Sequence, residues 1–145
     1  MKKNNIALIL NEEDKYPSDY NEHFVSEIEK IPTGSCDNVY VGDIFDRIEQ
    51  EHISSMLKNI VEKVKIEDGL VHIKSPDILQ LSWYTSRMNL DVHRLRYVLY
   101  QTNRKNCYTL EEMIDMILSV PNIGIVNAHY ENGYEYSITI NRYEN

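Results

Sequence analysis

Residues 36–76 carry the pattern that most constrains the fold, because they predict a strand, a helix and a second strand in succession. The first strand is a short β-favouring run, Val39 to Val41, just after the turn signal Pro32-Thr33-Gly34-Ser35. The helix has apolar residues at the spacing of one buried helical stripe, namely Ile53, Met56, Leu57, Ile60, Val61 and Val64.

The second strand of this unit follows a helix stop. Glu67-Asp68-Gly69 ends the helical pattern, and Gly69 suits the left-handed cap. Leu70 to Ile73 then favour a strand, which Ser75-Pro76 ends. A strand, a crossover helix and a strand in about 40 residues form the βαβ unit of a parallel sheet, so the chain is expected to have an α/β fold.

Further strands are expected near both ends of the chain. Ile6 to Leu10 is a continuous apolar run, which suits a central strand buried on both faces. Residues 123–130 and 134–142 favour antiparallel strands, joined by the tight-turn pair Asn132-Gly133. The sequence therefore predicts a mostly parallel sheet with a C-terminal antiparallel hairpin.

Three more helices are expected between these strands. The first runs from Asp77 to Arg87, with Ser75 as its cap and Pro76 at its first position. The second runs from Leu90 to Gln101, with inward apolar positions Leu90, Val92, Leu95, Val98 and Leu99. Thr109 and Glu112 predict a capping box for the third. Its buried stripe comprises Leu110, Met113, Ile114, Ile117 and Leu118.

The overall composition suits a single domain over residues 1–145. The 23 acidic and 15 basic residues give a net charge of −8, which disfavours general nucleic-acid binding. A solvated helix face is the prediction for the basic residues Arg94, Arg96, Arg104 and Lys105, and a local basic patch is the alternative. No apolar run approaches the roughly 18 residues of a membrane span. Two cysteines fit a reducing compartment, so a cytoplasmic location without membrane association is expected.

The stretch CDNVYVGDIFDRIEQEHISSMLKNIVEKVKIEDGLVHIKSPDI and the later YTLEEMIDMIL carry a family resemblance. The stretch resembles class I S-adenosylmethionine-dependent methyltransferases at four places. These are an acidic strand start at Asp37, a helix opening at Ile44 to Ile48, a helix stop at Glu67-Asp68-Gly69 and a strand end at Pro76-Asp77. The resemblance covers roughly residues 30 to 142. It implies a shortened Rossmann-like methyltransferase fold, in which residues 1–35 are a divergent N-terminal part and residues 36–142 the family-like part.

The turn after the first strand departs from that family. The family has a glycine-rich G-x-G-x-G turn here, because the backbone must approach the cofactor closely. This chain has Asn11-Glu12-Glu13-Asp14-Lys15 instead, and its first glycine is Gly34. We therefore expect the floor of the cofactor site to be missing and no cofactor to bind. Clustered carboxylates also suit a hard cation, but their spacing fits no calcium loop; a solvated acidic loop without metal is expected.

The stretch from Leu10 to Val39 has room for only one helix or one strand pair, so the sheet is expected to be trimmed. Residues 18–30 are compatible with a helix or with a short strand around residues 25–28. In the family, an acidic residue at the end of the second strand binds the ribose hydroxyls. Glu27 and Glu29 could align there, but neither is assigned. A trimmed sheet has an exposed edge, which needs a partner or charged protection.

Asp43 and Asp46 are the candidate cofactor-binding residues, and no catalytic residue is assigned. Both open the central helix at the carboxyl end of its strand, the edge where open α/β sheets bind ligands. Capping of the helix N-terminus is their alternative role. His72 is expected to be packed and hydrogen-bonded, and Cys107 to be an inert thiol.

The aromatic side chains of Trp83, Tyr84, Tyr97 and Tyr100 lie within the two central helical patterns. Packing in the core is the prediction for them. A patch at the centre of a protein interface is the alternative, because aromatic residues are enriched there.

The missing glycine turn and the retained core pattern together predict a non-catalytic methyltransferase-like protein. It would act through protein contacts, as a homo-oligomer or an accessory subunit. One alternative is an active S-adenosylmethionine-dependent methyltransferase on a small molecule or sugar, with the acidic loop and Asp43 in an atypical cofactor pocket. Another is a small enzyme that acts on S-adenosylmethionine or a sugar by a different reaction.

Overall fold

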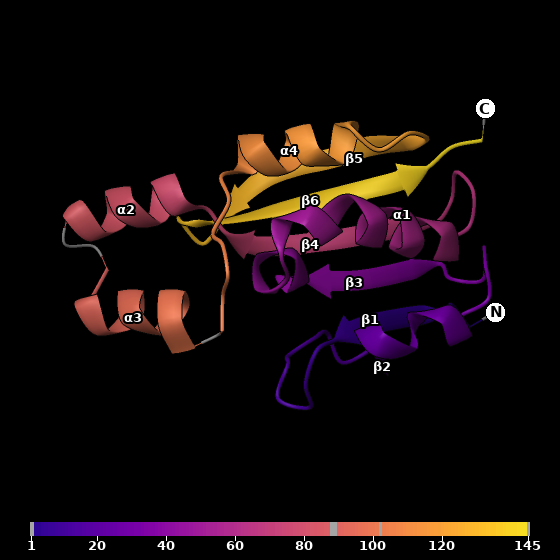
Figure 1. Cartoon of the computed structure of the whole chain (residues 1–145), viewed down its shortest axis with the longest axis horizontal. Helices are drawn as coiled ribbons and strands as arrows, with labels where there is room; N and C mark the ends of the chain where they lie inside the picture. Colours follow the sequence, from indigo (N-terminus) through magenta and orange to yellow (C-terminus); the bar gives the residue numbers. More distant parts are fainter. Residues whose placement is uncertain (1, 88–89, 102, 145) are drawn as a thin grey trace.

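The computed structural model describes residues 2–87, 90–101 and 103–144. Within them, the chain forms a six-stranded sheet in the order β2-β1-β3-β4-β6-β5 (Figure 1). The strands are β1 (Asn5–Ile9), β2 (Asn21–Phe24), β3 (Asn38–Gly42), β4 (Leu70–Pro76), β5 (Ile123–Glu131) and β6 (Glu135–Arg142). Strands β2, β1, β3 and β4 pair in parallel, whereas β6 is antiparallel to both β4 and β5. The predicted mostly parallel sheet with a C-terminal antiparallel hairpin is therefore confirmed.

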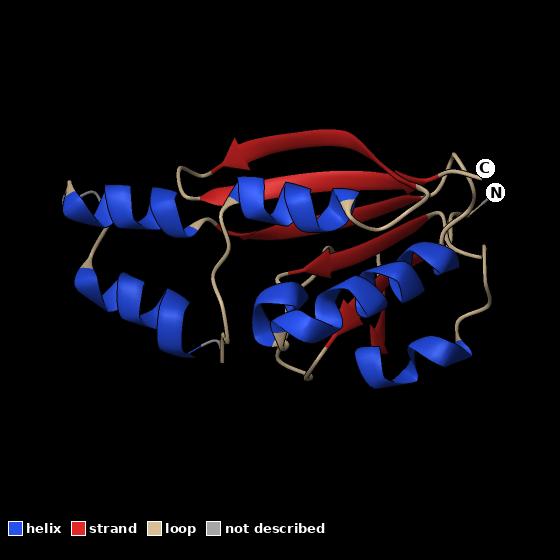
Figure 2. Cartoon of the chain, turned by 45° about the horizontal axis from the view of Figure 1, so that its top comes forward, coloured by secondary structure: helices blue, strands red, loops and turns tan. Residues whose placement is uncertain are grey.

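Helices cover one face of this sheet. The α-helices are α1 (Ile53–Lys63), α2 (Ile78–Ser86), α3 (Val92–Arg96) and α4 (Leu110–Leu118). Short 3₁₀ helices are η1 (Val25–Lys30), η2 (Ile44–Arg47) and η3 (Gln50–His52), and η4 (Tyr97–Gln101) is a π-helix. Helices α1, α4 and η1 lie on the same side of the strands, whereas α2 and α3 extend beyond the carboxyl end of β4 (Figure 2). The opposite face has no helix among the described residues.

The core lies between the sheet and this single helix layer. Alternate strand residues, such as Val41, Ile73 and Ile138, are buried against Leu57 of α1 and Ile117 of α4. The side chains between them point to the other face because strand residues alternate. There, Tyr40 pairs across the sheet with His72, and His72 pairs with Thr139, and all three are only partly buried.

Several local predictions are confirmed. Of the predicted run from Ile6 to Leu10, residues 6–9 are buried in β1, whereas Leu10 lies beyond the strand and is 37% exposed. The predicted stripe of α1 is buried at Ile53, Leu57 and Ile60. The hairpin turn has left-handed backbone at Asn132 (φ 51°) and Gly133 (φ 85°), as the Asn-Gly pair predicts. At the start of α4, the Thr109 hydroxyl accepts from the Glu112 amide, while the Glu112 carboxylate accepts from the Thr109 amide.

The role predicted for Gly69 is wrong. The left-handed residue after α1 is Glu67, with φ 67°, whereas Gly69 does not have a positive φ. A Cβ atom on Gly69 would lie 2.4 Å from the backbone nitrogen of Lys65 and 2.6 Å from its carbonyl oxygen. Gly69 is therefore required by the close passage of two backbone segments and not by a helix cap.

The predicted start of α2 is also wrong. Ser75 and Pro76 belong to β4, and the cap is Asp77. One carboxylate oxygen of Asp77 accepts from the amides of Leu79 (2.8 Å) and Gln80 (3.0 Å). Strand pairing with β6 continues through Pro76, so the helix begins two residues later than the sequence pattern suggests.

The segment before β3 and two helix faces also differ from the predictions. Within the stretch 18–30, residues 21–24 form β2 and residues 25–30 form η1, so neither the long helix nor the strand at 25–28 occurs. The predicted helix at 90–101 is α3 followed by η4, and Val92 in it is 54% exposed. Leu118 of α4 is also exposed. These side chains project where no second layer is present to bury them.

Candidate functional site

The candidate site is organised by Arg104, in the connection between η4 and α4. Its guanidinium donates to an Asp46 carboxylate oxygen at 2.7 Å and to an Asp43 carboxylate oxygen at 2.8 Å. Its Nε donates to the Val98 carbonyl at 2.7 Å. The side chain of Arg104 is only 8% exposed. The two predicted site residues are thus brought together, by a residue that sequence reasoning placed on a solvated face.

The backbone also holds this connection against the end of β3. Gly42 ends β3 with φ 60°, a conformation that favours glycine, and Asp43 follows directly. The amides of Lys105 and Asn106 both donate to the Asp46 carbonyl, at 2.7 and 3.0 Å. Residues far apart in sequence are therefore fixed at the carboxyl edge of the sheet.

Asp46 is a buried acid within this cluster. It is 0% exposed, and the Ser75 hydroxyl donates to it at 2.5 Å. Burial raises the pKa of Asp46 to about 7, although the hydrogen bond from Ser75 and the charge of Arg104 both favour the ionised form. Its second carboxylate oxygen has no hydrogen-bond partner among the described residues. Asp46 is thus a structural acid beneath the surface and does not face solvent.

A hollow of about 280 Å³ opens beside this cluster, at the carboxyl ends of β1, β3 and β4. Its lining carries charges of both signs, contributed by Asp14, Lys15, Asp43, Lys74, Arg104 and Glu135. Asp43 therefore borders the hollow, whereas Asp46 does not. The position agrees with the edge at which open α/β sheets bind ligands.

The side chain of Asp14 closes the acidic loop that follows β1. One carboxylate oxygen of Asp14 accepts from the Leu10 amide at 2.7 Å and from the Asn11 amide at 3.3 Å. Arg47 of η2 donates to both carboxylate oxygens, at 2.7 and 2.6 Å. Since Arg47 and Asp14 are only 10% and 15% exposed, this is a well-shielded bidentate pair. Of the three carboxylates in the loop, only Asp14 borders the hollow.

The acids considered for a ribose site lie elsewhere. Strand β2 ends at Phe24, before both of them. Glu27 forms an ion pair with Lys30 in η1, and Glu29 accepts from the Asn59 amide group. No group of three or more His, Cys, Asp or Glu side chains in the described residues could hold a metal ion.

His72 and Cys107 have structural surroundings, as the sequence predicts. The His72 ring lies 3.0 Å from the Asn38 side-chain oxygen and 3.4 Å from the Thr139 hydroxyl, and burial lowers its pKa. Burial raises the pKa of the Cys107 thiol to about 12, and that thiol donates to the Pro76 carbonyl. The Cys107 thiol is therefore not prepared for nucleophilic chemistry.

The aromatic prediction is wrong for three of four residues. Trp83, Tyr97 and Tyr100 are 47%, 45% and 75% exposed. Arg87 stacks over the Trp83 ring at 4.3 Å, and Arg94 lies 5.3 Å from the centre of the Tyr97 ring. Tyr84 is partly buried and packs edge-on against Trp83. Helices α2, α3 and η4 therefore present an aromatic, cationic surface.

Sequence reasoning did not find Arg47 or Arg104 as site residues. Arg47 follows Asp46 within the predicted helix opening, so its pairing with a loop 33 residues earlier has no local pattern. Arg104 lies in a polar connector beside Lys105, which is half-exposed and pairs with Glu49. No local pattern distinguishes the buried Arg104 from the half-exposed Lys105, so only their tertiary neighbours reveal the different roles.

Comparisons with known proteins define the fold family. No family model and no curated protein sequence matches this chain. Several solved structures do match. A methyltransferase dependent on S-adenosylmethionine from Methanosarcina mazei has 12% identity and a TM-score of 0.61, over 96% of this chain and 82% of that one. One from Anabaena variabilis has 12% identity and a TM-score of 0.60, over 94% of this chain and 67% of that one.

The RosA dimethyltransferase of 8-amino-8-demethyl-D-riboflavin from Streptomyces davawensis is also similar, with 15% identity and a TM-score of 0.58. The match covers 86% of this chain but only 35% of RosA. At such identities the likeness concerns the fold alone. The chain thus has the Rossmann-like fold of class I S-adenosylmethionine-dependent methyltransferases. In addition, no helix among the described residues is long and apolar enough to cross a membrane.

Proposed function

We propose that this chain is a methyltransferase-fold protein that does not transfer methyl groups and acts through contacts with other protein chains. One observation carries this proposal: the Asp14 carboxylate occupies the Leu10 and Asn11 amides at the end of β1. In the related fold, this backbone must stay bare so that it can approach the cofactor closely. Here it is capped by the chain's own side chain, and that side chain is held by Arg47.

The size and charge of the hollow support the same proposal. Its volume of about 280 Å³ lies at the lower limit of the roughly 300–1,000 Å³ typical of pockets that hold drug-sized ligands. Its bordering groups are largely paired already, since Arg104 binds Asp43 and Lys74 forms an ion pair with Glu131. A bulky cofactor would have to separate these pairs as well as the Asp14–Arg47 pair. The described residues therefore do not fit S-adenosylmethionine in its usual position.

Isothermal titration with S-adenosylmethionine and S-adenosylhomocysteine tests this proposal. We expect no binding heat and no rise in melting temperature at millimolar ligand, because a specific ligand would stabilise the folded state by mass action. The Asp43→Asn variant, titrated in parallel, serves as the matched control for a site at the hollow. Micromolar binding by the unaltered chain would overturn the proposal.

The alternative is an active methyltransferase with an atypical pocket, and the position of Asp43 at the hollow favours it. In that case, S-adenosylmethionine would bind to the unaltered chain, and Asp43→Asn would weaken this binding at least tenfold. Under the main proposal, both proteins give the same flat titration. The pair of titrations therefore separates the two functions without knowledge of a methyl acceptor.

A further inference from the structure

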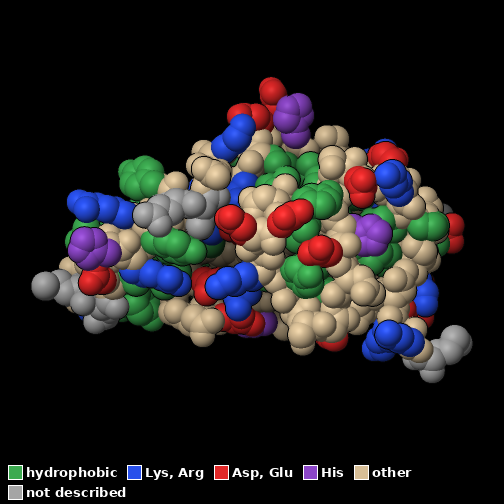
Figure 3. Space-filling view, turned by 90° about the horizontal axis from the view of Figure 1, so that it is seen from below, with side chains coloured by type: hydrophobic (Ala, Val, Ile, Leu, Met, Phe, Trp, Pro, Cys, Tyr) green, Lys and Arg blue, Asp and Glu red, His purple; other side chains and the backbone are tan. Residues whose placement is uncertain are grey.

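Residues 78–105, which we call the helical lobe, differ in charge from the rest of the chain. The lobe has five Lys or Arg residues and one Asp, a net charge of +4, whereas the remaining residues have ten basic and twenty-two acidic side chains, a net charge of −12. Figure 3 shows Lys and Arg side chains at the end of the molecule formed by the lobe and Asp and Glu side chains over the middle. The helical lobe and the rest of the chain therefore carry net charges of opposite sign.

The surface of the helical lobe is of the kind that binds protein. Trp83, Tyr97 and Tyr100 are exposed, as are Leu79 and Val92. Tryptophan, tyrosine and arginine are the residues most enriched at the energetic centres of protein interfaces. The arginines that stack on two of these rings add charge to the same surface. Such a surface gains most from a partner that is acidic and that covers the rings.

The same chain offers an acidic counterpart. Residues 11–29, which we call the acidic edge, have seven Asp or Glu residues and only one basic residue, Lys15. This segment includes β2, which is the terminal strand of the sheet and pairs only with β1 in the described part of the chain. An edge strand of this kind requires cover or charged protection. Glu12 and Glu13 are exposed there and have no ion-pair partner among the described residues.

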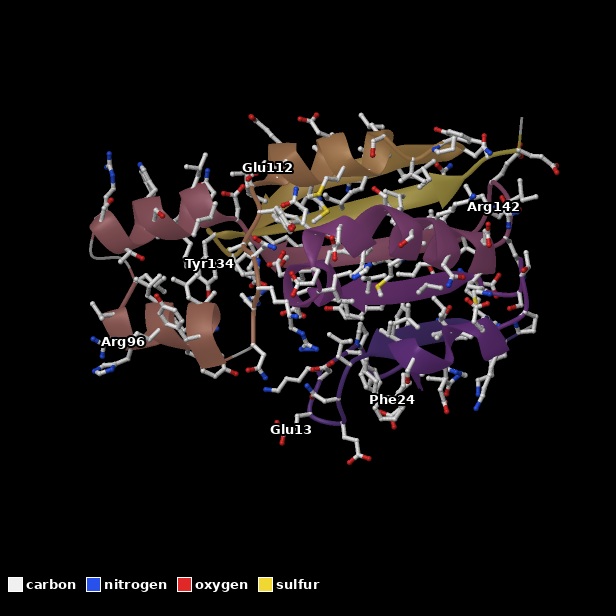
Figure 4. All side chains as sticks on the ribbon, in the orientation of Figure 1. Glu13, Phe24, Arg96, Glu112, Tyr134 and Arg142 are labelled. Carbon is white, nitrogen blue, oxygen red and sulfur yellow. The ribbon has the colours of Figure 1, made fainter. Side chains whose placement is uncertain are left out.

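No ion pair among the described residues joins the helical lobe to the acidic edge of its own molecule, and only Arg104 of the lobe borders the same hollow as Asp14 and Lys15. The ion pairs of the lobe in the described residues run to Asp43, Asp46 and Glu49. Figure 4 shows Arg96 pointing outward from α3 and Glu13 pointing outward from the connection between β1 and β2, on separate parts of the surface. Asp77 caps the first turn of the lobe, and Arg104 near its end binds Asp43 and Asp46, so both ends of the lobe are anchored beside the sheet. A contact between the two surfaces therefore requires two molecules.

We propose that the helical lobe of one molecule docks on the acidic edge of a second copy of this chain. This inference rests on the proposed function, because it names the protein chain that is contacted. A second copy fits better than a nucleic acid, because the net charge of −8 repels a polyanion while the two copies offer each other complementary surfaces. The contact covers the exposed rings and the open edge strand together.

Charge exchange between two variants tests the contact. The Arg87→Glu/Arg96→Glu variant reverses the charge of two exposed lobe residues and lowers the net charge of the lobe from +4 to 0. The Glu12→Lys/Glu13→Lys variant reverses the charge of two exposed residues of the edge and changes its net charge from −6 to −2. Sedimentation velocity at about 50 mM salt should show association of the unaltered chain and at least a tenfold weaker association of each variant alone. An equimolar mixture of both variants should associate again, because the new glutamates of one variant then face the new lysines of the other. Raising salt to about 500 mM shortens the screening length from roughly 14 to roughly 4 Å and should weaken all these contacts.

A matched control is Lys2→Glu/Lys58→Glu, which changes the net charge by the same amount at exposed positions outside both surfaces. It should associate like the unaltered chain. Trp83 is the only tryptophan, so its emission reports directly on the lobe. We expect a shift to shorter wavelength as the concentration of the unaltered chain rises, and no shift in the lobe variant.

Three outcomes would overturn the contact: a monomeric unaltered chain, a mixture that fails to associate, or a control variant that dissociates as the lobe variant does. Anisotropy with a labelled single-stranded oligonucleotide adds a further test. Binding that is lost in the lobe variant would assign the surface to nucleic acid instead. A monomer that still fails to bind S-adenosylmethionine would refute this contact and leave the proposed function standing.

Discussion

Replacing Asp46 with asparagine should change how the stability of the protein depends on pH. Asp46 is fully buried, and its pKa is raised from an ordinary value of 3.8 to about 7. Between these pH values the folded protein keeps a proton that the unfolded chain has released. The stabilisation from this proton is therefore complete below pH 3.8 and is lost as pH rises through 7. Asparagine cannot titrate, so the variant lacks this loss.

The size of the effect follows from the pKa shift. While the folded state binds one more proton than the unfolded state, the free energy of unfolding falls by about 1.4 kcal/mol for each unit by which the pH rises. Between pH 6 and 8.5, the folded carboxyl of Asp46 releases most of its proton, so the unaltered chain should lose about 1.4 kcal/mol relative to the variant. This range stays above the isoelectric point of about 5.1, where solubility is lowest.

Urea denaturation of both proteins at constant ionic strength measures this difference. The lowered pKa of His72 gives an opposite pH dependence, which cancels when the two proteins are compared. A constant cost of the substitution, such as an unpaired amide group beside Arg104, cancels in the same comparison. Stability curves that remain parallel between pH 6 and 8.5 would refute the assignment of Asp46 as a buried acid with a raised pKa.

Three other predictions concern the loop, the glycines and a thiol. Arg47→Met should lower the free energy of unfolding, measured by urea denaturation, by about 1–3 kcal/mol, because it leaves the Asp14 carboxylate without its shielded partner. A loss below about 0.5 kcal/mol would contradict a stabilising role of this pair. Gly69→Ala should lower the free energy of unfolding by about 2 kcal/mol or more, because the new Cβ atom would clash with the backbone of Lys65. Gly34→Ala should lower it by about 1 kcal/mol in the same assay, because Gly34 has φ 69° but open space around it. The reverse order would contradict this reasoning. Iodoacetamide should label Cys107 rapidly at pH 8 only after unfolding, because burial raises the pKa of its thiol to about 12. Mass spectrometry measures the labelling rate, and equal rates for the native and the unfolded protein would disprove this.

The sequence was sufficient for the elements with a clear period. The apolar run of β1, the stripe of α1, the capping box of α4 and the Asn-Gly turn each carry their information within a few residues. Strand β2 has no such signal. Its sequence, Asn-Glu-His-Phe, favours a strand neither by pattern nor by composition, and it is extended because it pairs in parallel with β1.

The candidate site was only half predictable for a similar reason. Asp43 and Asp46 could be selected because they follow a strand of a predicted parallel sheet. Arg104 lies 58 residues after Asp46, and only the return of the chain beside β3 brings its guanidinium there. The exposure of Trp83 and Tyr97 was missed because apolar helical patterns assume a layer to pack against, and none is present beyond the end of β4.

The bare face of the sheet restricts how this sequence can evolve. Parallel strands are usually buried on both sides and tolerate only apolar residues, whereas positions such as Tyr40, His72, Lys74 and Thr139 here meet solvent. Polar substitutions at these positions should be tolerated, whereas several apolar substitutions together would create an exposed hydrophobic patch that favours aggregation. Covering this face with a second helical layer would require apolar residues at the same alternate positions of the central strands.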